Sequence, residues 1–168
     1  MLRFLQTFLE IALWRKGPQD LPASRTLAIL VLAAYMAAGF VAVKMFDLRA
    51  STAVMFIIVD VLMIGLWLWA VLAFFGRRQR FTQTITATLG VGVLITLLDM
   101  MMRAVQLALG LDDALASNWL LVRFVIIALV MGRIFMHALD RGLVTGMALT
   151  VAIVYSTDAV ARLVLDRL

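Results

Sequence analysis

The sequence contains no cysteine, only two prolines and few charged residues, and these shortages exclude several classes of protein. Without cysteine the chain has no disulfide framework, no thiolate nucleophile and no thiolate metal ligand. Charged residues make up 15% of the chain and hydrophobic residues 65%, against about 45–50% apolar residues in soluble domains. Because so few charges cannot coat a soluble globule, the composition predicts an integral membrane protein.

Five long apolar stretches dominate the chain, near residues 24–45, 52–75, 84–109, 118–139 and 143–165. Each is long enough to cross about 30 Å of hydrocarbon, which requires roughly 20 helical residues. In lipid every backbone polar group needs a partner within the protein, which favours helices. The connections are short, so we expect residues 1–168 to form one all-α membrane domain, a bundle of five transmembrane helices.

Residues 1–16 precede these stretches and have a different pattern. They are apolar except for polar residues that fall on one helical face, namely Arg3, Gln6, Thr7 and Glu10. This pattern predicts an amphipathic helix that lies in the membrane interface. A cleaved signal peptide is the alternative, but the polar residues interrupt its apolar region and no small-residue cleavage site follows closely.

Basic residues gather on one side of the predicted spans. Arg77, Arg78 and Arg80 lie between the second and third spans, and Arg15, Lys16 and Arg141 fall on the same side. The excess of basic residues on cytoplasmic loops predicts a cytoplasmic N-terminus and a C-terminus across the membrane. The net charge of +5 reflects this topology anchor rather than a nucleic-acid partner. Alternatively, the three arginines bind anionic lipid headgroups or an acidic partner.

Charged residues also occur inside the apolar stretches. With alternating span directions, six of them fall in the half of the bilayer opposite the basic loops: Asp60, Asp99, Arg103, Arg123, Asp158 and Arg162. The four-residue spacing predicts Asp99–Arg103 and Asp158–Arg162 pairs within single helices. We expect the six to form a buried charge cluster or separate pairs, which are either structural, fixing helix register, or a polar pathway for an ion, proton or lipid headgroup. Asp60 has no partner in its own helix, so it either pairs with an arginine of another helix or carries a proton.

Other candidate chemistry is weak. His137 is the only histidine, so the chain cannot supply a histidine cluster for zinc or two axial haem ligands. The consecutive residues Met100, Met101 and Met102 point in three directions on a helix and cannot form one copper site. Asp60 and Asp99 could form an aspartyl protease dyad, but the flanking glycine and tyrosine signatures of that class are missing. We therefore predict neither a catalytic site nor a metal or cofactor.

Small residues predict where helices approach closely. Ala34 and Ala38 are four residues apart in the first span, and Gly142 and Gly146 form a GxxxG motif at the start of the fifth. Small residues at this spacing let helix backbones approach each other, either within the bundle or against a partner.

Two segments, PQDLPAS at residues 18–24 and RFTQTITATLGVG at residues 80–92, resemble segments of small bacterial inner-membrane proteins. The five-span layout with a cytoplasmic N-terminus is similar to that of the Yip-type family of membrane proteins. The resemblance implies a helical bundle in the bacterial inner membrane, with its C-terminus in the periplasm and without established catalysis. Eukaryotic Yip-type proteins are associated with small GTPases and membrane traffic. The acidic, aromatic region that they carry before the first span is absent here, and no site residues carry over.

These observations favour a non-enzymatic inner-membrane protein that serves as an accessory, stabilising or assembly subunit of a larger membrane complex. Its expected partners are the lipid bilayer and either other membrane protein subunits or a second copy of itself. The alternative is a small transporter, channel or lipid-handling protein that uses the charge cluster. These two hypotheses differ in what they predict at the cluster, because transport requires a water-accessible cavity there and an accessory subunit does not.

Overall fold

The structure is a computed structural model that describes residues 2–45, 50–110 and 113–165. Its helices are α1 (Leu2–Ala12), η1 (Pro18–Asp20), α2 (Arg25–Lys44), α3 (Ala50–Phe74), η2 (Arg78–Arg80), α4 (Phe81–Leu109), α5 (Asp113–Leu139) and α6 (Leu143–Leu165). Within the described residues, five helices, α2 to α6, are long and apolar enough to cross a membrane. The prediction of an all-helical, multi-pass membrane protein is confirmed at this level.

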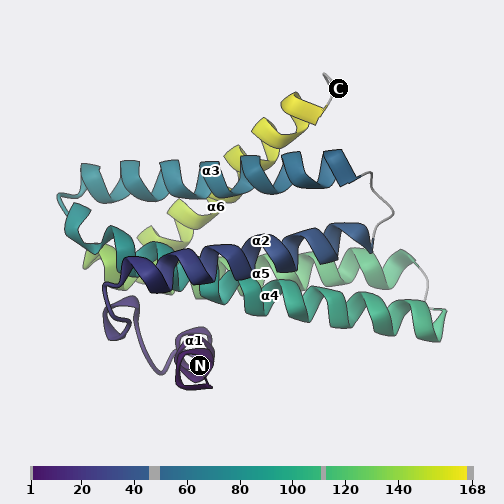
Figure 1. Cartoon of the computed structure of the whole chain (residues 1–168), viewed down its shortest axis with the longest axis horizontal. Coiled ribbons are helices and arrows are strands. Elements are labelled where there is room, and N and C mark those ends of the chain that lie inside the picture. The colour runs from purple at the N-terminus through teal and green to yellow at the C-terminus, as the bar shows by residue number, and fades with distance from the viewer. Residues whose placement is uncertain (1, 46–49, 111–112, 166–168) are drawn as a thin grey trace.

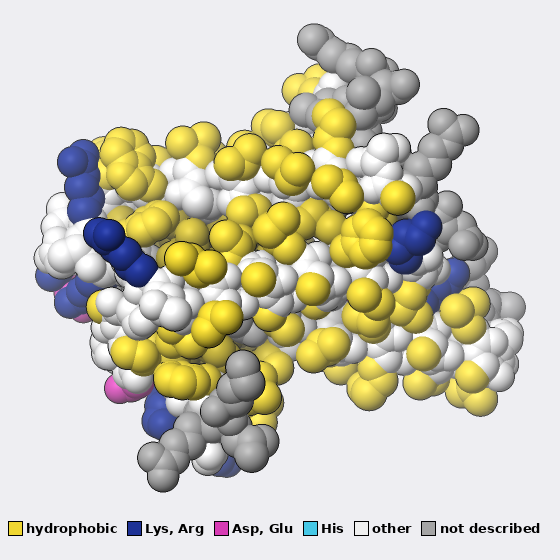
Figure 2. All heavy atoms as spheres, in the orientation of Figure 1, with side chains coloured by type: hydrophobic (Ala, Val, Ile, Leu, Met, Phe, Trp, Pro, Cys, Tyr) yellow, Lys and Arg dark blue, Asp and Glu magenta, His cyan; other side chains and the backbone are white. Residues whose placement is uncertain are grey.

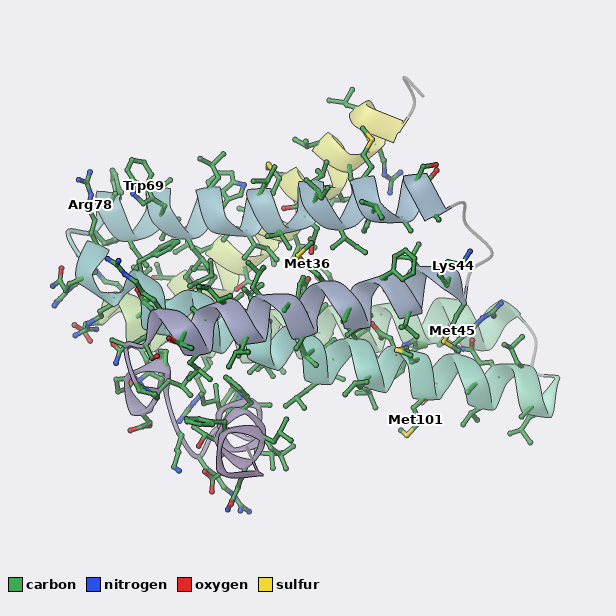
Figure 3. All side chains as sticks on the ribbon, viewed as in Figure 1. Met36, Lys44, Met45, Trp69, Arg78 and Met101 are labelled. Carbon is green, nitrogen blue, oxygen red and sulfur yellow. The ribbon has the colours of Figure 1, made fainter. Side chains whose placement is uncertain are left out.

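The long helices form an elongated bundle (Figure 1). Helices α2, α4 and α5 run side by side, α3 lies along one flank, and α6 crosses the bundle obliquely so that its C-terminal half extends past α3. The closest packing joins α2 to α4 and α5 to α6. We call the end that carries Arg77, Arg78 and Arg80 the Arg80 end, and the opposite end the Lys44 end (Figure 3). Apolar side chains cover most of the visible surface between these ends (Figure 2).

Helix α4 is the centre of the fold. In the most apolar part of each candidate span, 39% of the residues are buried in α4 but only 6% in α2. Ala87, Leu89 and Val91 of α4 are buried, and they pack in one core with Val31 of α2 and Ile134 of α5. A helix that buries residues all round its circumference must be enclosed by other elements. The half of α4 near the Arg80 end is enclosed in this way.

Helix α1 lies across the bundle axis at the Arg80 end, where Figure 1 shows it end-on. Phe8 and Ile11 are buried against the bundle, and a Cβ added to Gly90 of α4 would stand 2.5 Å from Cδ1 of the Phe8 ring. The apolar side chains of Leu5 and Leu9 are exposed, on a different side of the helix. Only part of the apolar surface of α1 is therefore used in packing against the rest of the chain.

Three helices end at the Arg80 end with the same backbone motif. Trp14, Gly76 and Asp140 have φ values of 65°, 69° and 52°, and each follows the end of α1, α3 or α5, respectively. The amide of the next residue bonds back to a carbonyl five positions earlier in each case, as from Arg15 to Glu10 at 2.8 Å. This Schellman arrangement usually has glycine at the left-handed position. Tryptophan and aspartate adopt this left-handed conformation less readily than glycine does, so Trp14 and Asp140 both need contacts with neighbouring side chains to hold it. Both residues make such contacts.

Candidate functional site

The first charged group in the middle of the bundle is Asp60. It lies ten residues beyond Ala50, the first residue of α3, and so about 15 Å along that helix. The hydroxyl of Tyr35 in α2 donates a hydrogen bond of 2.6 Å to Asp60 Oδ2. The Tyr35 ring rests on Gly92 of α4, where an added Cβ would stand 2.6 Å from ring atom Cε2. The missing side chain of Gly92 thus makes room for the ring, whose hydroxyl reaches Asp60.

The second charged group is Asp99 of α4, which contacts two side chains of α5. Arg123 Nε lies 2.8 Å from Asp99 Oδ2, and Trp119 Nε1 donates a bond of 3.1 Å to Asp99 Oδ1. Asp99 lies ten residues before the end of α4, and Arg123 lies ten residues after the start of α5. Because the two helices are consecutive and antiparallel, these equal separations place both residues at the same level, about 15 Å along each helix.

The predicted pair within α4 is therefore wrong, since Asp99 forms its ion pair with Arg123 of α5 rather than with Arg103. Arg123 approaches from a neighbouring helix at the same level, and Trp119, one turn away, satisfies the second carboxylate oxygen. A partner four residues along the same helix is not needed once a neighbouring helix supplies both donors. Arg103 lies one turn further along α4 with a half-buried side chain.

The two groups belong to one network. Arg123 also acts electrostatically on Asp60, so a single guanidinium lies within range of both carboxylates. We call the five residues Tyr35, Asp60, Asp99, Trp119 and Arg123 the central network, and they come from α2, α3, α4 and α5. Asp99 is neutralised by a cation in direct contact, whereas the direct contact of Asp60 is a neutral hydroxyl. This difference is the main chemical asymmetry of the site.

Asp158 and Arg162 lie apart from the central network. Arg162 Nε is 2.9 Å from Asp158 Oδ2, as the four-residue spacing predicts, but the side chains are 54% and 75% exposed. They do not lie in a buried cluster, because the half of α6 that carries them diverges from the other helices (Figure 1). The spacing in the sequence predicted this contact correctly, whereas the prediction that both side chains are buried is wrong.

The basic segment at the Arg80 end joins two connections of the chain. Arg80 Nη1 donates to the backbone carbonyls of His137 at 2.8 Å and Ala138 at 3.2 Å, and lies 3.0 Å from Asp140 Oδ1. Arg77 Nη2 lies 2.9 Å from Asp140 Oδ2. Arginine thereby satisfies carbonyls that the end of a helix leaves without partners. The hydrogen bond from Arg80, together with the positive charges of both arginines, lowers the pKa of Asp140.

The third arginine of this segment, Arg78, makes a different contact. Its guanidinium carbon lies 5.3 Å from the ring centroid of Trp69 on α3, and both side chains are labelled in Figure 3. A similar contact involves Arg133, which lies 5.0 Å from the Trp14 ring centroid and donates a bond of 2.8 Å to the Trp14 carbonyl. Arg133 therefore supports the left-handed backbone of Trp14. The arginines at this end fasten elements together in addition to carrying charge.

Of the four small residues predicted to mark close helix packing, Gly146 lies against the backbone of another described helix. A Cβ added to Gly146 would clash with the carbonyl oxygen of Gly132 in α5 and stand 2.9 Å from the carbonyl carbon. Gly142 has open space around it, Ala34 is exposed and Ala38 is half-buried. Gly146 does not pack through a GxxxG surface but against Gly132 across the α5–α6 crossing.

Several of these residues were missed by reasoning from the sequence. Tyr35, Trp119 and Gly132 complete contacts to Asp60, Asp99 and Gly146, respectively. Tyr35 could have been found, because it is the one side chain with a polar atom in the interior of an otherwise apolar α2. Gly132 carries no such signal, since a single glycine in an apolar helix gives no indication of its partner.

Comparisons with known proteins do not extend this description: no protein-family model, curated protein or solved structure matches the chain.

Proposed function

We propose that the protein is a non-enzymatic accessory or assembly subunit of a larger membrane complex in the bacterial inner membrane. The central network carries this proposal, because Asp60 and Asp99 each receive hydrogen bonds from side chains of other helices of the same chain. Charges held in this way fix the register of a bundle and stabilise one arrangement of its helices. The lipid-facing surfaces then remain available for other membrane proteins.

The proposed orientation places the Arg80 end in the cytoplasm. Arg77, Arg78 and Arg80 are at that end, and cytoplasmic loops carry an excess of basic residues. The N-terminus is then cytoplasmic and the C-terminus periplasmic. Resemblance to the Yip-type family supports the same layout, and membership of that family remains part of the proposal.

In this orientation α1 is an interfacial helix. Its axis crosses the bundle axis, as Figure 1 shows, and this direction supports an orientation parallel to the membrane plane. Phe8 packs on the bundle while Leu5 and Leu9 stay exposed, so the second apolar surface is positioned to face lipid. Glu10 pairs with Lys16 at 2.7 Å on the polar side. Helices with this division of side chains bind at the headgroup boundary.

The experiment that tests the accessory role is native mass spectrometry of the protein, extracted in mild detergent at natural abundance from its own host. Stoichiometric co-purification of other membrane proteins is the expected result. An isolated monomer, or an assembly of this chain alone, would contradict the proposal. Trp69→Ala tests the surface, because Trp69 is 52% exposed on α3 and aromatic residues dominate interface energies. Leu66→Ala, one turn earlier and 59% exposed, is the matched control.

One observation favours a second candidate function, which is proton or cation transport. Asp60 is bonded directly to a neutral tyrosine hydroxyl instead of a cation, and ionisable groups inside membranes often mark ion pathways. Ion flux into proteoliposomes that contain the purified protein tests this candidate. Flux that is lost in Asp60→Asn and retained in Tyr35→Phe would support transport. The absence of flux across a proton or monovalent-cation gradient in the wild-type protein would remove the candidate.

A further inference from the structure

Four arginines gather around Asp140 at the Arg80 end, and only two of them form ion pairs with it. Arg77 and Arg80 lie 2.9 Å and 3.0 Å from its carboxylate oxygens. Arg78 and Arg141 directly follow two members of this group in the chain, so they lie in the same corner of the bundle. Together the four arginines and Asp140 carry a surplus of three positive charges.

Arg78 and Arg141 share one kind of contact, in which the guanidinium lies near an aromatic ring of α3. The guanidinium carbon of Arg78 is 5.3 Å from the centroid of the Trp69 ring. That of Arg141 is 5.5 Å from the centroid of the Phe75 ring. Within the described ranges neither guanidinium forms an ion pair or a hydrogen bond, and both residues are exposed. An aromatic ring attracts a cation without supplying an anionic oxygen, so the N–H donors of both arginines are available to an anion.

Both arginines flank candidate spans. Arg78 comes four residues after Phe74, the last residue of α3. Arg141 comes two residues before Leu143, the first residue of α6. The hydrocarbon core of a bilayer ends near the ends of its spanning helices, and the headgroups lie just beyond it. The two guanidiniums are therefore at the level of the lipid phosphates.

Exposed apolar side chains adjoin Arg78 on the hydrocarbon side. Trp69, Leu66 and Leu62 recur at intervals of three or four, which places them on one face of α3. They are 52%, 59% and 65% exposed, and we call these three residues the α3 face. Figure 3 shows Arg78 beside Trp69 at the end of α3. A cation thus stands at the end of an apolar surface that runs into the membrane.

We propose that the guanidiniums of Arg78 and Arg141 bind the phosphates of anionic phospholipids, and that the acyl chains of the lipid at Arg78 lie along the α3 face. Charge complementarity selects an anionic lipid. A zwitterionic lipid brings a cation with its phosphate and leaves the positive surplus unchanged, whereas an anionic lipid reduces it. The α3 face selects a lipid over a soluble anion, which has no acyl chains to place there.

This assignment separates two roles among the arginines. Arg77 and Arg80 hold Asp140 and join two connections of the chain, whereas Arg78 and Arg141 offer their charges to the membrane. Lipid binding goes beyond the proposed function, because it requires no other subunit. Only the name of the leaflet, which is cytoplasmic, rests on the proposed orientation.

The test is native mass spectrometry of the full chain, purified, stripped of lipid in detergent and titrated with dioleoyl phosphatidylglycerol or dioleoyl phosphatidylethanolamine. Phosphatidylglycerol should bind more tightly. Arg78→Gln and Arg141→Gln should each weaken its binding roughly fivefold and leave phosphatidylethanolamine binding unchanged. Lys44→Gln is the matched control, because Lys44 is an exposed cation at the end of α2 and lies at the opposite end of the bundle (Figure 3). Its effect on phosphatidylglycerol binding should be less than about twofold, since it removes a charge outside the proposed site.

Four results would overturn the proposal. In the first, the wild-type chain binds both lipids equally. In the second, Lys44→Gln weakens phosphatidylglycerol binding as much as Arg78→Gln does. In the third, glycerophosphoglycerol, which is the headgroup without acyl chains, binds as tightly as the lipid, which would assign the arginines to a soluble anion. In the fourth, the chain has no lipid preference and an acidic protein co-purifies with the wild-type chain but not with Arg78→Gln, which would assign this corner to a protein partner.

A measurement on the wild-type chain replaces the variants if they do not accumulate. Raising the ionic strength from about 0.1 M to about 1 M shortens the screening length from roughly 10 Å to roughly 3 Å. Phosphatidylglycerol binding should then weaken while phosphatidylethanolamine binding stays the same. An equal response of both lipids would overturn the charge pairing. Because this titration uses the isolated chain, its failure is distinct from a failure to find other subunits.

Discussion

Replacing Gly146 by alanine should force α5 and α6 apart at their crossing. The added Cβ would clash with the carbonyl oxygen of Gly132 and lie 2.9 Å from its carbonyl carbon and 3.1 Å from the amide nitrogen of Met136. All three atoms belong to the backbone of α5, so no side chain can rotate to relieve the overlap. Ordinary van der Waals contacts of a Cβ lie at 3.4–4 Å. The helices must therefore separate where Gly146 meets the backbone of α5.

Overpacking of a tight core costs about 1–3 kcal/mol, and a clash with backbone places Gly146→Ala at the upper end of that range. A cost of about 3 kcal/mol changes the unfolding equilibrium more than roughly a hundredfold. The assay is reversible unfolding by sodium dodecyl sulfate in mixed micelles, followed by the fluorescence of the four tryptophans. Gly142→Ala is the matched control, because nothing lies within 4 Å of a Cβ at that position.

We expect the Gly142→Ala control to change stability by less than about 0.5 kcal/mol, as surface substitutions usually do. Equal unfolding midpoints for the two variants would refute the reasoning, since they differ only in whether the added methyl group meets the backbone of α5. A loss of stability in Gly142→Ala alone would also refute it. The comparison thus tests the α5–α6 crossing itself.

Three other predictions concern the charged and polar groups. Asp99→Asn should destabilise the bundle by about 1–3 kcal/mol in the same assay, because Arg123 loses its counter-charge. The double variant Asp99→Asn with Arg123→Gln should recover part of that loss. If the effects of the two substitutions simply add, the two residues do not interact. Tyr35→Phe should cost about 1–2 kcal/mol by removing the hydrogen bond from the Tyr35 hydroxyl to Asp60 while leaving the ring in place, so an unchanged midpoint would contradict that contact. Asp140 has a lowered pKa in the folded state, so its contribution to stability should be complete above its unfolded pKa of about 4 and should disappear as the pH falls through the lower folded value. Unfolding midpoints measured from pH 6 to pH 3 should decline less in Asp140→Asn than in the wild-type protein, and parallel curves would exclude this role.

The contacts at the Arg80 end and those of the central network stabilise the bundle at different levels. At the Arg80 end, Arg80 and Arg77 join the connection between α3 and α4 to the connection between α5 and α6. Half-way along the bundle, Asp60 and Asp99 join neighbouring helices. The half of α6 near the Lys44 end has no comparable fastening to the described helices.

The sequence by itself determined the number, length and approximate limits of the spans. The physical reason is local: a helix in lipid needs about 20 apolar residues, whatever its neighbours are. The five predicted stretches correspond to α2 to α6 within a few residues, apart from α5, which begins at Asp113 instead of residue 118. The Asp158–Arg162 contact was predictable for the same reason, because both residues belong to one turn of one helix.

Only the tertiary structure decided which helices satisfy which polar groups. The choice of Arg123 over Arg103 by Asp99 depends on the register between α4 and α5, and the contact of Tyr35 with Asp60 depends on the space above Gly92. Spacing along a chain contains no information about distances between helices. The oblique path of α6 follows from the approach of Gly146 to Gly132, and that path decides that Asp158 and Arg162 lie on the surface instead of in the interior.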